Sequence, residues 1–241
     1  MRNFRRFRAA ALALVCPGFT GAHVAWADPA HPDFYVEDPY APHVTNGSTA
    51  RLGTAVGFIY GQPEGVLALG MTAAVGHRWG RLALEAEYAY LDFQVAGPDD
   101  TKLGDGQRLG TIARVDVIRL GSTIVGPNSM AALYVEGGAA TAWNHWTRPG
   151  ASEQSRIVPD DTKRVEGQVG FGITLDHRLQ EPIGFPHRVA WFLGWRLALS
   201  PHEPVTGSVC RGVSCRPLTV MDDGSVVDRS MLFQSSLAFT F

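Results

Sequence analysis

The sequence is short of charge, of cysteine and of long apolar runs. Only 18% of its 241 residues are charged, against roughly a quarter in an average globular chain. The formal net charge of −2 comes without a dense basic stripe, so nucleic acid is not an expected partner. With 45% hydrophobic residues, the chain has enough apolar material for a folded core, which argues against a disordered or fibrous protein.

Several patterns that would indicate an enzyme or a helical membrane protein are missing. After residue 27 no segment approaches the roughly 18 apolar residues of a spanning helix, and no amphipathic helix of useful length appears. The sequence contains no G-x-S-x-G motif, and its glycines form no nucleotide-binding fingerprint. We therefore expect no catalytic residues, no metal site and no cofactor.

The first 27 residues have the features of a cleaved secretory signal peptide. A basic start with Arg2, Arg5, Arg6 and Arg8 precedes a short apolar stretch, and residues 25–27 read Ala-Trp-Ala, a typical cleavage signal. We expect residues 1–27 to be removed.

The rest of the chain divides at about residue 49. Residues 28–48 are rich in Pro and Asp, and we interpret them as a periplasmic lead-in. Residues 49–241 alternate apolar and polar side chains with a period of two, which indicates β-strands. The alternation predicts strands at about 50–61, 65–79, 81–95, 106–120, 130–144, 163–177, 187–200 and 228–241.

Two architectures fit eight alternating strands. A soluble, lipocalin-like barrel places its apolar face inside around a ligand, whereas a membrane barrel places it outside against lipid. The large size of the apolar-face side chains favours the membrane barrel, as do the strand lengths and the aromatic residues near strand ends. The apolar face includes Tyr88, Phe171, Trp191, Trp195 and Phe239, and the strand-end aromatics are Tyr60, Trp79, Trp143, Trp146 and Phe241. We predict an all-β, eight-stranded, antiparallel, up-and-down transmembrane β-barrel.

The face opposite the large apolar residues carries small or charged side chains. In a membrane barrel this face lines a lumen too narrow to be an open channel. The charged members are Glu85, Glu87, Arg114, Asp116, Glu136, Glu166 and Arg196. Because buried charges must be paired, we expect a charge network that plugs the lumen. The excess of acids over arginines in this set predicts either water in the lumen or protonated carboxyls. A gated ion or proton path is the functional alternative.

The predicted outward loops are 62–64, 96–105, 145–162 and 201–227. The last one holds Cys210 and Cys215, which in an exported chain indicate a disulfide, worth about 2 kcal/mol for so short a loop. Asp222-Asp223-Gly224 lies between residues 218–221 and 225–228, which predicts a hairpin turning at this point.

Acidic pairs occur in three of these loops, at Asp99-Asp100, Asp160-Asp161 and Asp222-Asp223. We interpret them as solvated turn residues, with calcium binding or cation-bridged contacts to lipopolysaccharide as the alternative. His145, between Trp143 and Trp146, is expected to be an interfacial residue.

The last eight residues resemble the C-terminal assembly signal of bacterial outer-membrane barrel proteins. Gln234 is the polar residue, Ser236 the small one, and Phe239 and Phe241 are the terminal aromatics. The resemblance implies recognition by the barrel assembly machinery and a location in the bacterial outer membrane.

Three segments are similar to strands of the lipid A deacylases, a family of eight-stranded outer-membrane hydrolases. They are Leu133–Ala139, Glu166–Gly172 and Leu193–Arg196. In that family a His-x-Ser pair follows the third segment, but here the matching positions hold Leu199 and Pro201. Ser200 and His202 lie nearby in reversed order, so the resemblance extends to the fold without the catalytic pair.

Taken together, these features predict an integral outer-membrane barrel that is not an enzyme. We expect it to stabilise the envelope or to present its outer loops, as a monomer in contact with outer-membrane lipid and lipopolysaccharide. A lipid A acyl hydrolase and a small porin-like channel are the alternatives.

Overall fold

The computed structural model describes residues 46–59, 66–95, 102–120, 125, 129–148, 156–179, 186, 188–202, 205–211, 214–221 and 227–241. The predicted signal peptide, the lead-in up to residue 45 and Tyr60 lie outside the described residues. In the described part of the chain, no helix is long and apolar enough to cross a lipid bilayer.

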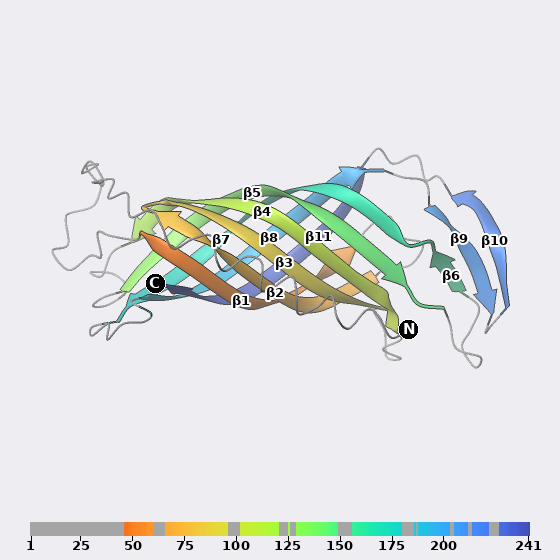
Figure 1. The fold of residues 1–241 in the computed structure, drawn as a ribbon, viewed down its shortest axis with the longest axis horizontal. Helices are drawn as coiled ribbons and strands as arrows, with labels where there is room; N and C mark the ends of the chain where they lie inside the picture. Colours follow the sequence, from red (N-terminus) through yellow and green to blue (C-terminus); the bar gives the residue numbers. More distant parts are fainter. Residues whose placement is uncertain are drawn as a thin grey trace. The chain divides into compact units, whose positions relative to one another are not determined.

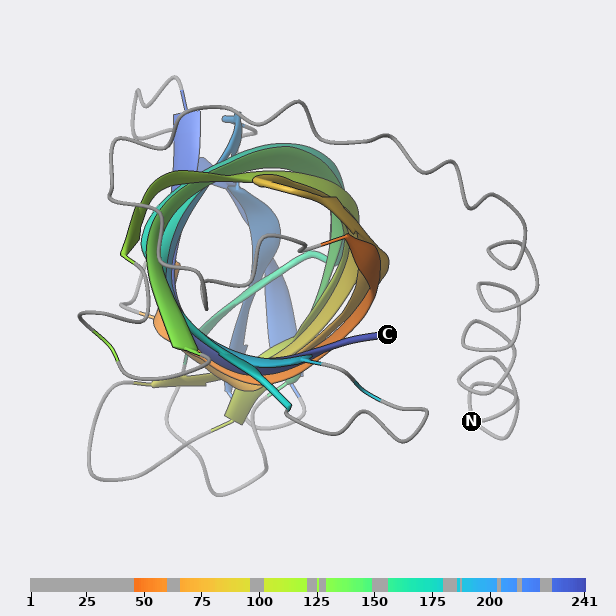
Figure 2. The same cartoon turned by 90° about the vertical axis from the view of Figure 1, so that its left-hand side faces the viewer.

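Eight strands form a closed antiparallel barrel, which Figure 1 shows from the side and Figure 2 along its axis. The barrel strands are β1 (Gly47–Ile59), β2 (Val66–Trp79), β3 (Leu82–Val95), β4 (Lys102–Leu120), β5 (Ser129–Trp146), β7 (Thr162–Arg178), β8 (Arg188–Pro201) and β11 (Val227–Thr240). Each strand pairs with the next barrel strand along the chain, and β1 closes the barrel against β11 from Thr49↔Thr240 to Ile59↔Ser230. The predicted fold is therefore confirmed.

The eight predicted segments coincide with the barrel strands to within a few residues. The largest difference is at β4, which begins at Lys102 and not near residue 106, and pairs with β3 up to Gln94. The predicted turn near residue 80 is also present. Gly80 has a φ of 56°, a left-handed conformation that glycine adopts without steric cost.

The outer surface of the barrel is apolar around its whole circumference. Large apolar side chains on every barrel strand point outward and are 37% to 66% exposed, among them Leu52, Met71, Tyr88, Leu109, Val135, Phe171, Trp195 and Leu237. Within the described barrel strands, exposed charged side chains occur only near strand ends, as at Lys102, Lys163, Arg178 and Arg229. We call the uncharged zone between these ends the apolar band.

The aromatic residues near the strand ends divide between the two faces. Trp79, Trp143 and Phe241 are 46%, 37% and 37% exposed, as an interfacial position requires. Trp146 does not join them, because a shift of three residues from Trp143 reverses the direction of the side chain in a strand. It is 7% exposed and packs inside the barrel with its ring centroid 5.2 Å from that of Phe93. The prediction that Trp146 is interfacial is wrong.

Two of the predicted outward loops, 145–162 and 201–227, contain a second, three-stranded sheet. This sheet, the cap sheet, consists of β6 (Arg156–Pro159), β9 (Val205–Arg211) and β10 (Ser214–Met221) in the order β10-β9-β6. In Figure 1 it lies beyond the end of the barrel away from the C-terminus. We call this end of the barrel the cap end and the opposite one, where β1 begins and β11 ends, the N/C end.

The cap sheet packs on an apolar cluster inside the cap end of the barrel. Val158 and Cys210 from the cap sheet join barrel residues in this cluster, which we call the cap core. Its barrel members are Ala55, Ile59, Val66, Ala68, Leu91, Phe93, Leu103, Trp146 and Leu232. Backbone bonds tie the same region together, with Thr147 N donating to Leu103 O at 2.7 Å and Asp160 N to Thr206 O at 2.9 Å.

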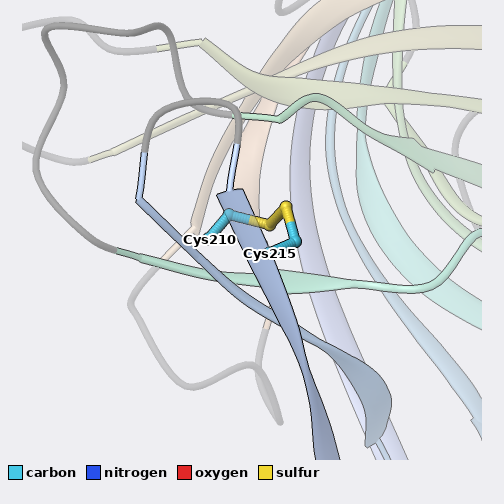
Figure 3. Close-up of a disulfide and its surroundings, with 2 residues drawn as sticks. All are labelled: Cys210 and Cys215. Carbon is cyan, nitrogen blue, oxygen red and sulfur yellow. A yellow bond between two sulfur atoms is a disulfide. The ribbon is translucent and has the colours of Figure 1, made fainter.

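The hairpin predicted at Asp222-Asp223-Gly224 is replaced by another pairing. Residues of β10 pair backward with β9, from Ser214↔Arg211 to Met221↔Val205. Val227 and Asp228 pair with β8 instead. The observed hairpin turns between β9 and β10, where it is closed by the predicted disulfide. Cys210 and Cys215 are directly opposite one another, with Cα atoms 4.1 Å apart and an S–S bond of 2.09 Å (Figure 3).

Two glycines on β7 offer a test of the close packing inside the barrel. A Cβ atom at Gly172 would lie 2.2 Å from Leu193 O and 2.6 Å from Tyr134 Oη, whereas one at Gly167 meets nothing nearer than Leu199 O at 3.9 Å. We expect Gly172→Ala to lower the free energy of unfolding by about 1–3 kcal/mol through overpacking. Gly167→Ala, its control on the same strand, changes stability by less than about 0.5 kcal/mol.

The measurement is urea unfolding of the refolded full chain. The folded fraction at each urea concentration is monitored by the heat-dependent mobility of the chain on a gel. Equal midpoints for the two alanine variants would contradict the packing described for Tyr134 and Gly172.

Candidate functional site: the charged lumen

The interior of the barrel holds a layered set of ion pairs. The charged residues predicted to face the lumen lie there and are at most 9% exposed: Glu85, Glu87, Arg114, Asp116, Glu136, Glu166 and Arg196. Each sits at an inward position of its strand, so the period-two pattern delivers it to the lumen. The structure divides them among three layers along the barrel.

The central layer is a closed ring in which arginines and glutamates alternate. We call it the Arg–Glu ring, and its members in order are Arg51, Glu85, Arg114, Glu136, Arg196 and Glu87. Arg51 Nη2 lies 2.8 Å from Glu85 Oε2, and Arg114 Nη2 lies 3.1 Å from the same oxygen. Arg114 Nε continues the ring to Glu136 Oε2 at 3.5 Å. One half of the ring thus joins β1, β3, β4 and β5.

The other half returns to the starting residue through β8. Arg196 Nε donates to Glu136 Oε1 at 2.8 Å and its Nη1 donates to Glu87. Glu87 Oε2 accepts from Arg51 Nη2 at 2.7 Å, which closes the ring. Every member is ion-paired with two partners of opposite charge, and with three arginines and three glutamates the ring is neutral as a unit. This arrangement offsets the desolvation of charges that would each cost several kcal/mol if left alone.

Two aromatic rings pack on the N/C side of the Arg–Glu ring. The guanidinium carbon of Arg114 lies 4.4 Å from the ring centroid of Phe192 and 5.1 Å from that of Tyr134. Arg51 lies 5.9 Å from the Phe192 centroid. Contacts of this kind attract a cation to the face of the ring and fill the space around it. Together the ion pairs and the aromatic rings occupy the middle of the lumen.

A second polar layer lies between the Arg–Glu ring and the cap core. Arg108 Nε donates to Glu166 Oε2 at 2.7 Å, and its Nη2 donates to Ser230 Oγ at 3.0 Å. Arg164 Nη1 donates to Asp228 Oδ2 at 2.6 Å, and Arg164 Nε lies 3.7 Å from Glu166. Each carboxylate therefore has at least one arginine.

The third layer closes the N/C end. Asp116 accepts from Arg78 and, at 2.9 Å, from Arg119 Nη2. Asp176 accepts from Arg188 Nε at 3.0 Å and lies 3.8 Å from Arg78. Arg78 and Arg119 also donate to Gly80 O in the turn between β2 and β3. Arginines outnumber carboxylates among the described residues of this layer.

The expected excess of negative charge in the lumen is therefore wrong. Sequence reasoning named too few interior charges, and most of those it missed are arginines: Arg51, Arg78, Arg108, Arg119, Arg164 and Arg188, with Asp176 and Asp228 as the missed acids. The signal was available, because each lies an even number of residues from a recognised inward position, apart from Arg119, which follows a β-bulge between Asp116 and Ile118. With these arginines present, each described carboxylate of the three layers has a cationic partner.

Of the residues considered for hydrolase chemistry, Ser200 and His202 both lie beside Asp228, whereas His145 lies apart from them. Ser200 is buried on β8 opposite Asp228, and His202 Nδ1 lies 2.7 Å from Asp228 Oδ1 inside the cap end. Leu199 and Pro201, which the sequence resemblance matched to the His-x-Ser positions, point outward and are exposed. His145 is also on the outer surface, with its side chain 61% exposed.

His145 makes a contact that its sequence position did not suggest. Its Nδ1 donates to Asp161 Oδ2 at 2.7 Å, and Trp146 N donates to Asp161 Oδ1 at 3.0 Å. Partial burial disfavours the charged form of Asp161, but these two hydrogen bonds outweigh it and lower the pKa of the carboxyl. Asp161 thus fastens the chain before β7 to the end of β5. No group of three or more metal-ligating side chains occurs among the described residues, and Asp99, Asp100, Asp222 and Asp223 lie outside them.

The residues of the C-terminal signal divide between the two faces of β11. Gln234 points inward and is 6% exposed, whereas Phe241 points outward and is 37% exposed. Phe239 lies on the same outward face as Phe241. Phe241 N donates to Ser48 O at 2.9 Å, so the last residue extends the pairing that closes the barrel.

These features define a closed eight-stranded antiparallel barrel with an apolar exterior and an ion-paired interior. The fold is similar to that of Neisserial surface protein A (NspA), with a TM-score of 0.50 at 12% identity, over 81% of this chain and 97% of that one. The outer membrane protein OprG from Pseudomonas aeruginosa aligns with a TM-score of 0.43 at 13% identity, over 83% and 97% of the two chains. No family model matches the sequence, and no curated protein matches it.

The closed ring predicts a strong coupling between its members. Arg196→Met removes the partner shared by Glu87 and Glu136, and we expect it to cost about 3–5 kcal/mol in the free energy of unfolding. Adding Glu87→Leu leaves a neutral chain of two arginines and two glutamates. The double variant should therefore be more stable than Arg196→Met alone.

A double-mutant cycle measured by urea unfolding gives the coupling energy. Arg229→Met, which removes an exposed arginine of β11, serves as the control and shifts stability by less than about 0.5 kcal/mol. Additive losses in the double variant would show that Glu87 and Arg196 do not act as a pair.

Proposed function

We propose that the chain is an integral outer-membrane barrel whose lumen is plugged by ion pairs and whose cap sheet is presented outside the cell. The apolar band carries this proposal, because it places large hydrophobic side chains on the outside of all eight strands. A soluble barrel reverses this arrangement. The charged interior is stable in such a setting because its carboxylates are paired with arginines.

The orientation follows from the connections and the ends of the chain. Transmembrane barrels of this kind have short periplasmic turns and longer outer loops. The turn at Gly80 is at the N/C end, whereas the cap sheet is built from the two longest connections. The N/C end is therefore assigned to the periplasm and the cap sheet to the exterior. With the Arg–Glu ring across the lumen, an open channel is disfavoured, and stable single-channel current steps from the purified barrel would contradict a plugged lumen.

A charge placed in the apolar band tests the membrane assignment. Val169 points outward near the middle of β7 and is 54% exposed. An arginine at a lipid-facing midplane position costs about 2–4 kcal/mol, so Val169→Arg should insert into lipid vesicles less completely than the unmodified chain. Thr206→Arg, which changes an exposed residue of β9 in the cap sheet, is the control and should insert normally.

Insertion is measured as the fraction of chain that resists protease and migrates in the compact form on an unheated gel. Normal insertion of both variants, or an unmodified chain that stays in the aqueous phase, would argue against the proposal.

A lipid A acyl hydrolase is the second candidate, favoured by one observation. His202 and Asp228 form a hydrogen-bonded pair beside Ser200. Serine, histidine and aspartate are the residue types of a hydrolytic triad. Their burial inside the cap end separates them from the lipid surface. We therefore expect the mass spectrum of lipid A to be the same in cells with and without the protein. Loss of an acyl chain that depends on the protein and on Ser200 would establish the enzyme instead.

A further inference from the structure

The tip of the β9–β10 hairpin carries two arginines on one face. Arg211 is opposite Ser214 in the ladder, and Arg216 follows two residues later on β10. Because side chains two apart on a strand share a face, Arg211 and Arg216 are diagonal neighbours across the strand pair. Both are exposed. Neither makes an ion pair or a hydrogen bond within the described part of the chain.

The disulfide lies on the other face of the same hairpin. Cys210 is fully buried in the cap core, so this face packs toward the barrel while the arginine face points away from it. Val209, 37% exposed, lies between the two arginines on the outer face. The covalent bond fixes the register of the two strands one residue away from each arginine (Figure 3). It thereby fixes the spacing of the two arginines along the hairpin backbone.

This arrangement favours the binding of an anion. Two like charges at neighbouring cross-strand positions repel one another, and the described strands of the cap sheet contain no Asp or Glu. Elsewhere in the described structure, arginines gathered in the lumen are matched by carboxylates. The cap sheet thus concentrates unmatched positive charge on a surface that the disulfide keeps rigid. Because the hairpin backbone is already ordered, only the arginine side chains lose entropy when the pair binds an oxyanion.

We propose that Arg211 and Arg216 form a binding site for an acidic polysaccharide, through its sulfate or carboxylate groups. The site rests on the proposed function, which places the cap sheet outside the cell. Arginine donates paired hydrogen bonds to such oxyanions. A polymer carries these anionic groups at repeated intervals along its chain, so two neighbouring groups can bind the two arginines. The cap sheet lies beyond the barrel end (Figure 1), away from the edges of the apolar band, where lipid headgroups would lie. A dissolved polymer therefore fits the site better than a lipid phosphate.

The test uses the full refolded chain in detergent micelles and heparin as the acidic polysaccharide. We expect the unmodified chain to bind immobilised heparin and to be released by salt, since the attraction is electrostatic. The variant R211Q/R216Q should bind at least tenfold more weakly at the same low salt concentration. The control R178Q/R229Q removes the same charge from exposed arginines outside the cap sheet, and its affinity should stay within twofold.

A second variant separates the role of the disulfide from that of the charges. C210S/C215S keeps both arginines but releases the hairpin, and its affinity should lie between those of the unmodified chain and R211Q/R216Q. Unchanged heparin binding by R211Q/R216Q, or an equal loss in R178Q/R229Q, would overturn the site. Binding to lipopolysaccharide micelles but not to heparin would overturn the choice of a polysaccharide acid over a lipid phosphate.

The micelle assay is independent of where the protein resides, so failure of the two proposals is distinguishable. Normal vesicle insertion without heparin binding rejects the site and leaves the membrane assignment standing. Heparin binding by a chain that does not insert into vesicles rejects the membrane assignment.

Discussion

The requirement that buried charges be matched governs the interior of this barrel. In a narrow lumen with little room for water, an isolated guanidinium or carboxylate carries a large desolvation cost. The Arg–Glu ring meets this requirement by giving each of its members two partners of opposite sign. The other layers follow the same rule with pairs and triplets. One set of side chains thus fills the lumen and balances its charge.

The outer surface depends on the same strands through the period of two. Every strand that contributes a charge to the lumen also contributes large apolar side chains to the apolar band, one residue away. Arg196, for example, lies between Trp195 and Leu197. Register and surface are therefore linked, because a slip of one residue would bring charges to the outside and apolar residues to the lumen. Because apolar outward residues alternate with polar inward residues, the barrel has an apolar outer surface although its sequence contains no long apolar run.

The sequence predicted the parts of the structure that repeat. Eight alternating segments were sufficient for the strand number, the strand edges and the direction of residues such as Glu85 and Phe171. Two cysteines close together in the sequence were also sufficient to predict the Cys210–Cys215 disulfide. Arg51 and Arg108 were not predicted to face the lumen because the residues around them in the sequence are mostly small or apolar. Their two-residue spacing from other inward positions nevertheless places them inward. The error at Trp146 is similar, because its position near a strand end predicted an interfacial residue although alternation from Trp143 directs its side chain inward.

The cap sheet lay beyond what alternation alone predicts. Its strands come from two separate connections, and β6 has only four residues, so no long pattern marks it. The hairpin was placed at the Asp-Asp-Gly turn signal, while the observed pairing depends on how β9 meets β6 and the cap core. Such long-range choices are decided by packing in three dimensions. The same limit applies to the partners within the lumen, which depend on side chains from strands far apart in the sequence.

The closure between β1 and β11 has a consequence for the rate of folding. Arg51 reaches Ser236, 185 residues away, and Arg196 reaches Glu87 across 109 residues. Contacts between such distant segments slow folding, because much of the chain must be ordered before they form. The Arg–Glu ring is completed only when β1, β3, β4, β5 and β8 have all come together. We therefore expect it to form late, after the transition state has been passed, so that it slows unfolding more than it speeds folding.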